Sequence, residues 1–188
     1  MNRKGVLFAT GLLALLALVS MVSATVVTFD DTTYLSADYA GLTWDPQWVL
    51  WDSAASELYP PYSSPNVIYS HNFGGWIGFE KPVLFKGAWF SGPASYTSCH
   101  FEGYKDGVKI GDSPTLSMNP TPTFLNAGFT SPVDKVSVVC DNNNHFVVDD
   151  ITYEEAGVNA PEFPVTALPV AMIIGMLGVI LMIRRKED

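Results

Sequence analysis

The sequence predicts an all-β fold for residues 25–156, an antiparallel, jelly-roll-like β-sandwich. Short apolar or alternating runs recur along this stretch, and clusters of Gly, Pro, Asn, Asp and Ser separate them. No window keeps the 3.6-residue period of an amphipathic helix for a useful length. Regular short strands without helical crossovers favour antiparallel strands packed in two layers.

Nine runs are expected to form strands. They are Thr25–Asp31, Asn66–Ser70, Gly75–Phe79, Val83–Ser91, Ser95–Tyr104, Val108–Gly111, Thr121–Phe129, Lys135–Cys140 and His145–Tyr153. The clearest hairpin signal is Lys105-Asp106-Gly107, because an Asp-Gly pair between two strands fits the tight turns that join antiparallel neighbours.

The first 24 residues have the parts of a secretory signal peptide. Arg3 and Lys4 give a charged start, and Val6–Val19 is an apolar stretch. Val22-Ser23-Ala24 then fits the small-residue pattern of a cleavage site. The mature chain is therefore expected to begin at Thr25, and the alternative is an uncleaved signal anchor.

The far end of the sequence predicts a membrane span. Val165–Ile183 holds 19 residues without a charge, close to the roughly 20 that cross a bilayer core. The basic cluster within residues 184–188 fits the cytoplasmic side. The sequence thus divides into a signal peptide (1–24), a β domain (25–156), a short extended linker (157–164), a transmembrane helix (165–183) and a basic cytoplasmic end (184–188).

The linker carries a motif of its own, Pro161-Glu162-Phe163-Pro164, and Ala167-Leu168-Pro169-Val170 follows it. An acidic Pro-Glu-Phe segment, an apolar helix and a basic end together resemble the PEF-CTERM sorting signal of archaeal surface proteins. The resemblance implies that Pro161, Glu162, Phe163 and Pro164 are read by an archaeosortase-like membrane enzyme. It also implies a location on the outer face of the cell membrane. The alternative is an ordinary C-terminal transmembrane anchor.

The β domain carries a series of short motifs. In chain order they are Phe29-Asp30-Asp31, Tyr39–Trp44, Ser64–Tyr69, Thr121–Phe124, Val133–Val136 and Val148–Tyr153. Their order resembles that of the jelly-roll β-sandwich domains found upstream of PEP-CTERM-type sorting tails. The resemblance implies the fold of carbohydrate-binding modules, and a fold does not by itself decide a function.

The charge of the chain excludes one class of partner. Between the two apolar ends, five lysines stand against 17 acidic residues, which gives a net charge of −12. A surface this acidic repels phosphate backbones, so nucleic acid is not expected as a partner. An acidic surface of this kind suits the binding of divalent cations or an extracellular medium of high ionic strength.

The two cysteines, Cys99 and Cys140, are expected to form a disulfide, because export places the domain in an oxidising compartment. By strand alternation, Cys99 shares a face with Phe101 and Cys140 shares a face with Val138. Both sulfurs are then directed to the core, as a bridge between neighbouring strands or sheets requires. The alternative is two buried free thiols.

Four aspartates suggest a cation site. Asp30 and Asp31 end the first predicted strand, and Asp149 and Asp150 lie inside the last apolar run. The first and last strands of a jelly roll tend to lie close, and four carboxylates brought together repel one another without a cation. Their hard oxygens suit a structural Ca²⁺. The alternative is that they bind turn amides or face water.

A cluster of aromatic residues suggests a glycan-binding surface, since exposed Trp and Tyr rings stack on sugar faces. The candidates are Trp44, Trp48, Trp51 and Tyr59. The alternative is that two or more of the indoles fill the core, because Trp is highly buried on average. Trp76 and Trp89 lie in strongly predicted strands and are expected in the core.

Catalytic motifs are sparse, so the chain is not expected to be an enzyme. The three histidines are isolated in sequence, and there is no Gly-x-Ser-x-Gly or His-Glu-x-x-His motif. The sequence favours a surface-anchored envelope protein with a structural or adhesive role. A carbohydrate-binding module is the alternative. A glycoside hydrolase is the weakest interpretation, because it needs paired carboxylates in a cleft, for which Glu57, Glu80 and Glu102 are the candidates.

Overall fold

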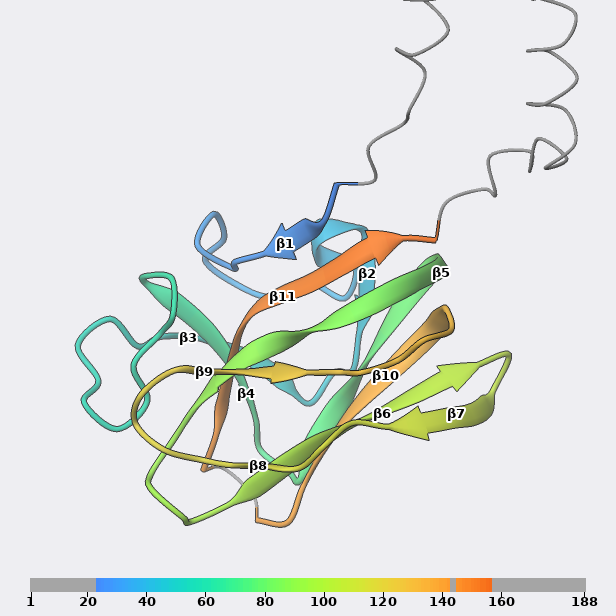
Figure 1. Cartoon of the computed structure of the whole chain (residues 1–188). Helices are drawn as coiled ribbons and strands as arrows, with labels where there is room; N and C mark the ends of the chain where they lie inside the picture. Colours follow the sequence, from blue (N-terminus) through green and yellow to red (C-terminus); the bar gives the residue numbers. More distant parts are fainter. Residues whose placement is uncertain (1–22, 143–144, 157–188) are drawn as a thin grey trace, which may run out of the picture. The chain divides into compact units, whose positions relative to one another are not determined.

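A computed structural model of the chain describes residues 23–142 and 145–156 (Figure 1). The sorting motif, the predicted transmembrane helix and nearly all of the predicted signal peptide lie outside these residues. Within the described ranges, no helix has the length and apolar character needed to cross a membrane.

The described chain is built from antiparallel strands and one short 3-10 helix. In order the elements are β1 (Thr25–Val27), η1 (Tyr39–Gly41), β2 (Leu42–Trp44), β3 (Trp48–Asp52), β4 (Asn66–Ser70), β5 (Gly74–Ser91), β6 (Ser98–Lys105), β7 (Val108–Asp112), β8 (Leu116–Ser117), β9 (Thr123–Asn126), β10 (Val133–Cys140) and β11 (Val147–Glu155). The all-β prediction is confirmed.

The strands form two layers that share strand β5. One layer, here called the β11 sheet, runs β3-β4-β11 to the second half of β5, with β9 beyond it and β1 paired to the far end of β11. The other layer, here called the β10 sheet, joins β2 and the first half of β5 to β10, β6 and β7, with β8 on β6. Figure 1 shows β5 passing diagonally between β11 and β10.

Strand β5 is one 18-residue element where the sequence predicted two. The predicted break around Pro82 is instead the place where the strand changes partners: Gly78 pairs with Lys135 of β10, and Val83 pairs with both Val133 and Glu155. A register shift between Val133 and Lys135 marks the change. A bulge of this kind bends a strand without ending it, so β5 continues from one sheet into the other.

The core lies between the two sheets and is rich in aromatic rings. Phe85 and Phe90 of the β11 sheet contact Phe101 of the β10 sheet, with ring centroids 4.9 and 5.5 Å apart. Ile77 and Val138 are buried beside them. Because side chains alternate along a strand, the residues between these positions face outward on opposite sides of the sandwich.

The predicted disulfide is present. Cys99 of β6 lies directly opposite Cys140 of β10, and the two Cα atoms are 4.1 Å apart. Both side chains are buried, as their alternation predicted. The bridge therefore joins neighbouring strands within the β10 sheet and does not link the two sheets.

The strand prediction is also wrong at other places, and β8 was not predicted. The first strand ends at Val27, because Phe29 turns into the left-handed region with φ 66° and its ring enters the core. Strands β2 and β3 were not predicted, although each is a short run that contains tryptophan. A turn joins β2 to β3, and in it the Asp45 carboxylate accepts a hydrogen bond from the backbone amide of Gln47.

Candidate functional site

The loop between β3 and β4, residues 53–65, packs on the outer face of the β11 sheet. The Ser91 hydroxyl donates to the Pro60 carbonyl at 2.7 Å. The amides of Tyr62 and Ser63 both donate to Asp149 Oδ2 at 2.8 Å. Under this loop Asp149 is buried, although alternation directs its side chain away from the core.

Three aromatic rings surround a cavity at the edge of this loop. Trp51 contacts Tyr59 at 5.8 Å and Tyr69 at 6.3 Å, both edge-to-face. These rings line a cavity of about 270 Å³ together with Phe146 and Val147. The Trp51 side chain is 37% exposed, so its indole is open to a ligand. The structure thus brings the predicted residues Trp51 and Tyr59 into contact and adds Tyr69, which the sequence analysis did not propose.

A histidine and a further tyrosine lie beside this aromatic cluster. The Tyr59 hydroxyl lies 3.3 Å from His145 Nδ1, and the His145 ring contacts the exposed ring of Tyr96 at 4.1 Å. Burial, followed by the nearby Tyr96, raises the pKa of the Tyr59 phenol above its ordinary value. Tyr59 is therefore a neutral hydroxyl near neutral pH and can donate as well as accept a hydrogen bond.

A second ring pair lies under the same loop. Tyr62 stacks on Trp89 with ring centroids 3.6 Å apart and an angle of 8° between the planes. Phe124 of β9 contacts Trp89 edge-to-face, with ring centroids 5.6 Å apart. Tyr62 is 52% exposed. The prediction that Trp89 belongs to the core is therefore wrong, because its neighbours Ala88 and Phe90 take the inward positions.

Two of the predicted ligand-binding residues are corrected by the structure. Trp44 and Trp48 are only 3% and 5% exposed, and both belong to the core. Their indole N–H groups donate to the carbonyls of Tyr39 and Trp76. Because both indole N–H groups are hydrogen-bonded and both rings are buried, neither indole is available to a ligand.

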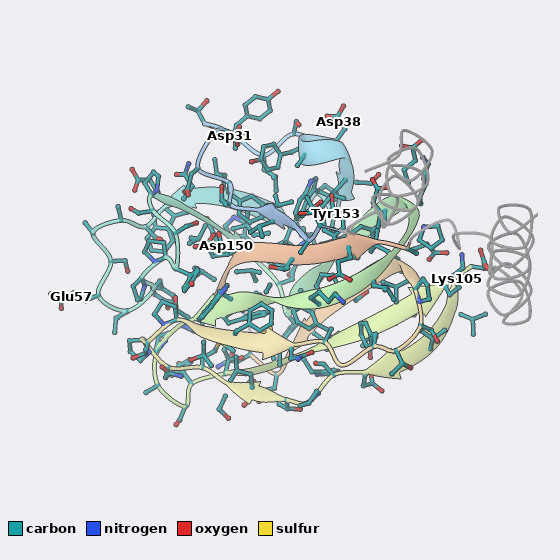
Figure 2. The ribbon with its side chains drawn as sticks, turned by 45° about the horizontal axis from the view of Figure 1, so that its top comes forward. Asp31, Asp38, Glu57, Lys105, Asp150 and Tyr153 are labelled. Atoms are coloured by element: carbon teal, nitrogen blue, oxygen red, sulfur yellow. A yellow bond between two sulfur atoms is a disulfide. The ribbon has the colours of Figure 1, made fainter. Side chains whose placement is uncertain are left out.

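Three of the four predicted cation ligands accept hydrogen bonds from the segment between Tyr62 and Asn66. The Asp149 carboxylate accepts hydrogen bonds from the backbone amides of Tyr62 and Ser63. The Asp150 carboxylate accepts one from the Ser63 hydroxyl at 2.6 Å. The Asp30 carboxylate accepts one from the backbone amide of Asn66 at 2.9 Å. Figure 2 shows Asp150 on strand β11.

The fourth aspartate, Asp31, is directed elsewhere and accepts from the Tyr39 hydroxyl. The four carboxylates therefore do not form one group, and backbone amides or hydroxyls bind each of them. Ca²⁺ binding at Asp30, Asp31, Asp149 and Asp150 stays a prediction.

A different group of three potential metal ligands lies on the β10 sheet. The ligand atoms of His100, Glu102 and Asp112 lie within 4.8 Å of one another. The Lys109 ammonium already stands between the two carboxylates, at 2.7 Å from Glu102 and 2.6 Å from Asp112. A lysine thus supplies the positive charge that these carboxylates require.

The candidate carboxylates for glycoside hydrolysis do not form a pair. Glu57 and Glu80 are exposed, and Figure 2 shows Glu57 at the outer end of its loop, directed away from the sandwich. Hydrogen bonds from Lys109 and then Tyr104 lower the pKa of Glu102 below its ordinary value. A general acid in a glycosidase needs the opposite shift.

Comparison with known proteins gave matches only among solved structures. No protein-family model matches the chain, and no curated protein does. The similar structures include a family 29 carbohydrate-binding module, at 12% identity over 73% of this chain and 91% of that chain, with a TM-score of 0.45. Variants of CBM29-2 complexed with mannohexaose and with cellulohexaose match at 12% identity, each over 73% of this chain and 94% of theirs, with TM-scores of 0.44 and 0.43. At this level the likeness carries no weight about a ligand, so a function has to be argued from the side chains of this chain.

Proposed function

We propose that this domain is a carbohydrate-binding module of a surface-anchored protein. The observation that carries the proposal is the cavity between Trp51, Tyr59 and Tyr69. Ligand pockets are lined mainly by apolar and aromatic side chains, with a few polar groups that fix the orientation of the ligand. Here the rings offer faces and edges for a sugar ring, and Tyr59 and His145 offer hydrogen bonds at its edge.

The charge of the domain favours a neutral sugar as the ligand. The acidic surface opposes the approach of sulfated or uronic acid polymers. Tyr and Trp rings supply large contact areas with little loss of conformational entropy. A neutral oligosaccharide meets these conditions, because it has apolar ring faces and many hydroxyl groups.

The proposed activity fits the predicted ends of the chain. A signal peptide and a PEF-type sorting tail would place the domain outside the membrane, after processing by an archaeosortase-like enzyme. A glycan-binding domain held at that position would act in adhesion or in the structure of the envelope. It would need no catalytic residue and no cofactor for this role.

An array of neutral oligosaccharides that includes mannohexaose and cellulohexaose tests the proposal. We expect the wild-type protein to bind at least one of them with a Kd below 1 mM. The Trp51→Ala variant should lose at least about tenfold in affinity, since aromatic anchors carry much of the binding energy at such sites. Trp51→Phe, which keeps a ring in place, should retain most of the affinity. Absence of binding by the wild-type protein across the whole array would contradict the proposal.

A further inference from the structure

We infer that the domain has a second glycan-binding surface on the outer face of the β10 sheet, centred on Trp76, and that one molecule can therefore link two glycan chains. This inference rests on the proposed function, because it assigns the same class of ligand to a second surface. Trp76 was expected in the core, and the structure leaves it half-buried.

Strand alternation places the Trp76 side chain on the outside of the sandwich. Its neighbour Ile77 is buried in the core, and Ser137, directly opposite Trp76 on β10, lies between the inward-facing Val136 and Val138. Continuing across the sheet, Ser137 lies opposite Glu102 on β6. Asp112 of β7 lies opposite Glu102. An indole, a hydroxyl and two carboxylates thus form one row across four strands.

Three glycines of β5 lie beside the Trp76 indole and the hollow next to it. Gly78 leaves room for the Trp76 ring: a Cβ atom there would lie 3.4 Å from Cζ3 of the indole. Gly74 and Gly75 line a shallow hollow of about 510 Å³ with Phe73, Trp76 and Ser137. A Cβ atom at Gly74 would collide with the Val138 carbonyl, and one at Gly75 would collide with the Trp48 indole, so the chain needs glycine at both positions beside the hollow.

The polar groups on this face suit an uncharged ligand. Asn72 and Gln47, which are hydrogen-bonded to each other, stand at the edge of the hollow and offer amide donors and acceptors. The Lys109 ammonium offsets the charge of Glu102 and Asp112. Lys135 lies 4.4 Å above the Tyr104 ring on the same face. Asp45 also lines the hollow, so the face opposes anionic ligands, and its hydrogen-bonding groups beside an aromatic ring favour a segment of neutral polysaccharide as the occupant.

The two surfaces lie on opposite sides of the core. Trp51 faces outward from the β11 sheet, where its neighbour Leu50 packs against the core. Trp76 faces outward from the β10 sheet. Because the core fills the space between the sheets, one oligosaccharide cannot contact both indoles through the domain. Two occupied surfaces would hold two glycan segments, which makes the protein a cross-linker.

Stoichiometry tests this inference directly. The full chain, inserted as single copies in lipid nanodiscs, is titrated with mannohexaose and with cellulohexaose by calorimetry. We expect two bound oligosaccharides per chain in the wild type, one in Trp51→Ala and one in Trp76→Ala. Ser137→Arg fills the hollow from the neighbouring strand and leaves Trp76 in place, so it should also reduce the number to one. Tyr34→Ala removes a ring that is 69% exposed and lies on neither surface, and should leave two.

The outcomes separate the two proposals. No binding by the wild type contradicts the proposed function itself. One oligosaccharide per chain, lost in Trp51→Ala and unchanged in both Trp76→Ala and Ser137→Arg, leaves the first site intact and overturns the second. A Trp76→Ala variant that is unfolded by circular dichroism leaves the decision to Ser137→Arg. Binding at Trp76 by a protein and not by either sugar would also overturn the inference.

Discussion

Asp149 is a buried carboxylate that holds the aromatic loop in place. Its side chain is 2% exposed, and its two oxygens accept backbone amides from Tyr62, Ser63 and Asp150. None of the salt bridges among the described residues includes Asp149. Burial, with the charge of Asp150 adding to it, raises the pKa of Asp149 to about 7, although the amide hydrogen bonds oppose the shift.

This shift predicts that the domain loses stability as the pH rises. The folded state binds the Asp149 proton more tightly than the unfolded chain, whose Asp has a pKa near 4. Asp149 therefore contributes stability that is fully present below about pH 4 and is lost as the pH rises toward about 7. The Asp149→Asn variant should show a flatter dependence of the unfolding free energy on pH across this window. The measurement is urea unfolding at pH 4, 5, 6 and 7.

Asp141→Asn is the matched control for Asp149. The Asp141 carboxylate also accepts hydrogen bonds, one from the backbone amide of Ser98 and one from the Thr97 hydroxyl. These hydrogen bonds lower the pKa of Asp141 below its ordinary value. The folded state therefore disfavours protonation of Asp141, and its contribution is lost as the pH falls. Replacing Asp141 should remove a stabilisation that is present at pH 7 and absent in acid. Equal pH slopes for wild type and Asp149→Asn would contradict the role given to Asp149.

Among the elements, the β6–β10 pair is the part of the fold that the sequence predicted best. Alternation directed Cys99 and Cys140 inward, and the structure pairs them directly across the two strands. The hairpin at Asp106-Gly107 also forms where it was expected, between β6 and β7. Both features follow from the alternation of side chains and from turn residues between strands, and these patterns can be read from a single sequence.

The disulfide is expected to stabilise the fold mainly through the unfolded chain. It closes a segment with a sequence separation of 41, for which the chain-entropy relation gives about 4 kcal/mol. Reduction, or the double variant Cys99→Ser with Cys140→Ser, should lower the unfolding free energy by this order. The measurement is urea unfolding with and without a reductant. An effect below about 1 kcal/mol would show that the unfolded chain is already constrained in this region.

The aromatic site was only partly predictable, because long-range packing creates it. Trp51 and Tyr59 are near in sequence, and they were proposed together. Tyr69, by contrast, reaches the cavity through the pairing of β3 with β4. The loop that buries Asp149 depends on contacts across more than 80 residues. Trp76 and Trp89 were expected in the core because they lie in strongly predicted strands. Strand alternation, if used alone, would have placed both side chains on the outer faces of the sheets.

At the scale of the whole molecule, the predicted signal peptide and sorting tail would hold the domain at the outer side of a membrane. The domain residues carry the strong negative charge, and the basic residues outside the domain gather at the two ends of the chain. Aromatic surfaces on both outer faces of the sandwich would let a tethered domain hold envelope glycans in more than one direction. Because both surfaces belong to one domain, each would have a raised effective concentration for a polymer that is already bound at the other.

The tether itself gives the last prediction. If Pro161-Glu162-Phe163-Pro164 is a sorting motif, the protein isolated from its native membrane should lack residues 165–188, because the transmembrane helix is removed when the enzyme joins the chain to its acceptor. Mass spectrometry of the C-terminal peptide measures this directly. Replacing Glu162 and Phe163 by Ala should preserve the helix and leave an intact chain that ends at Asp188. Exchanging Val179 for Leu, which keeps the apolar helix and leaves the motif and the residues that follow it unchanged, should be processed like the wild type. An intact wild-type chain would instead identify residues 165–183 as a permanent membrane anchor.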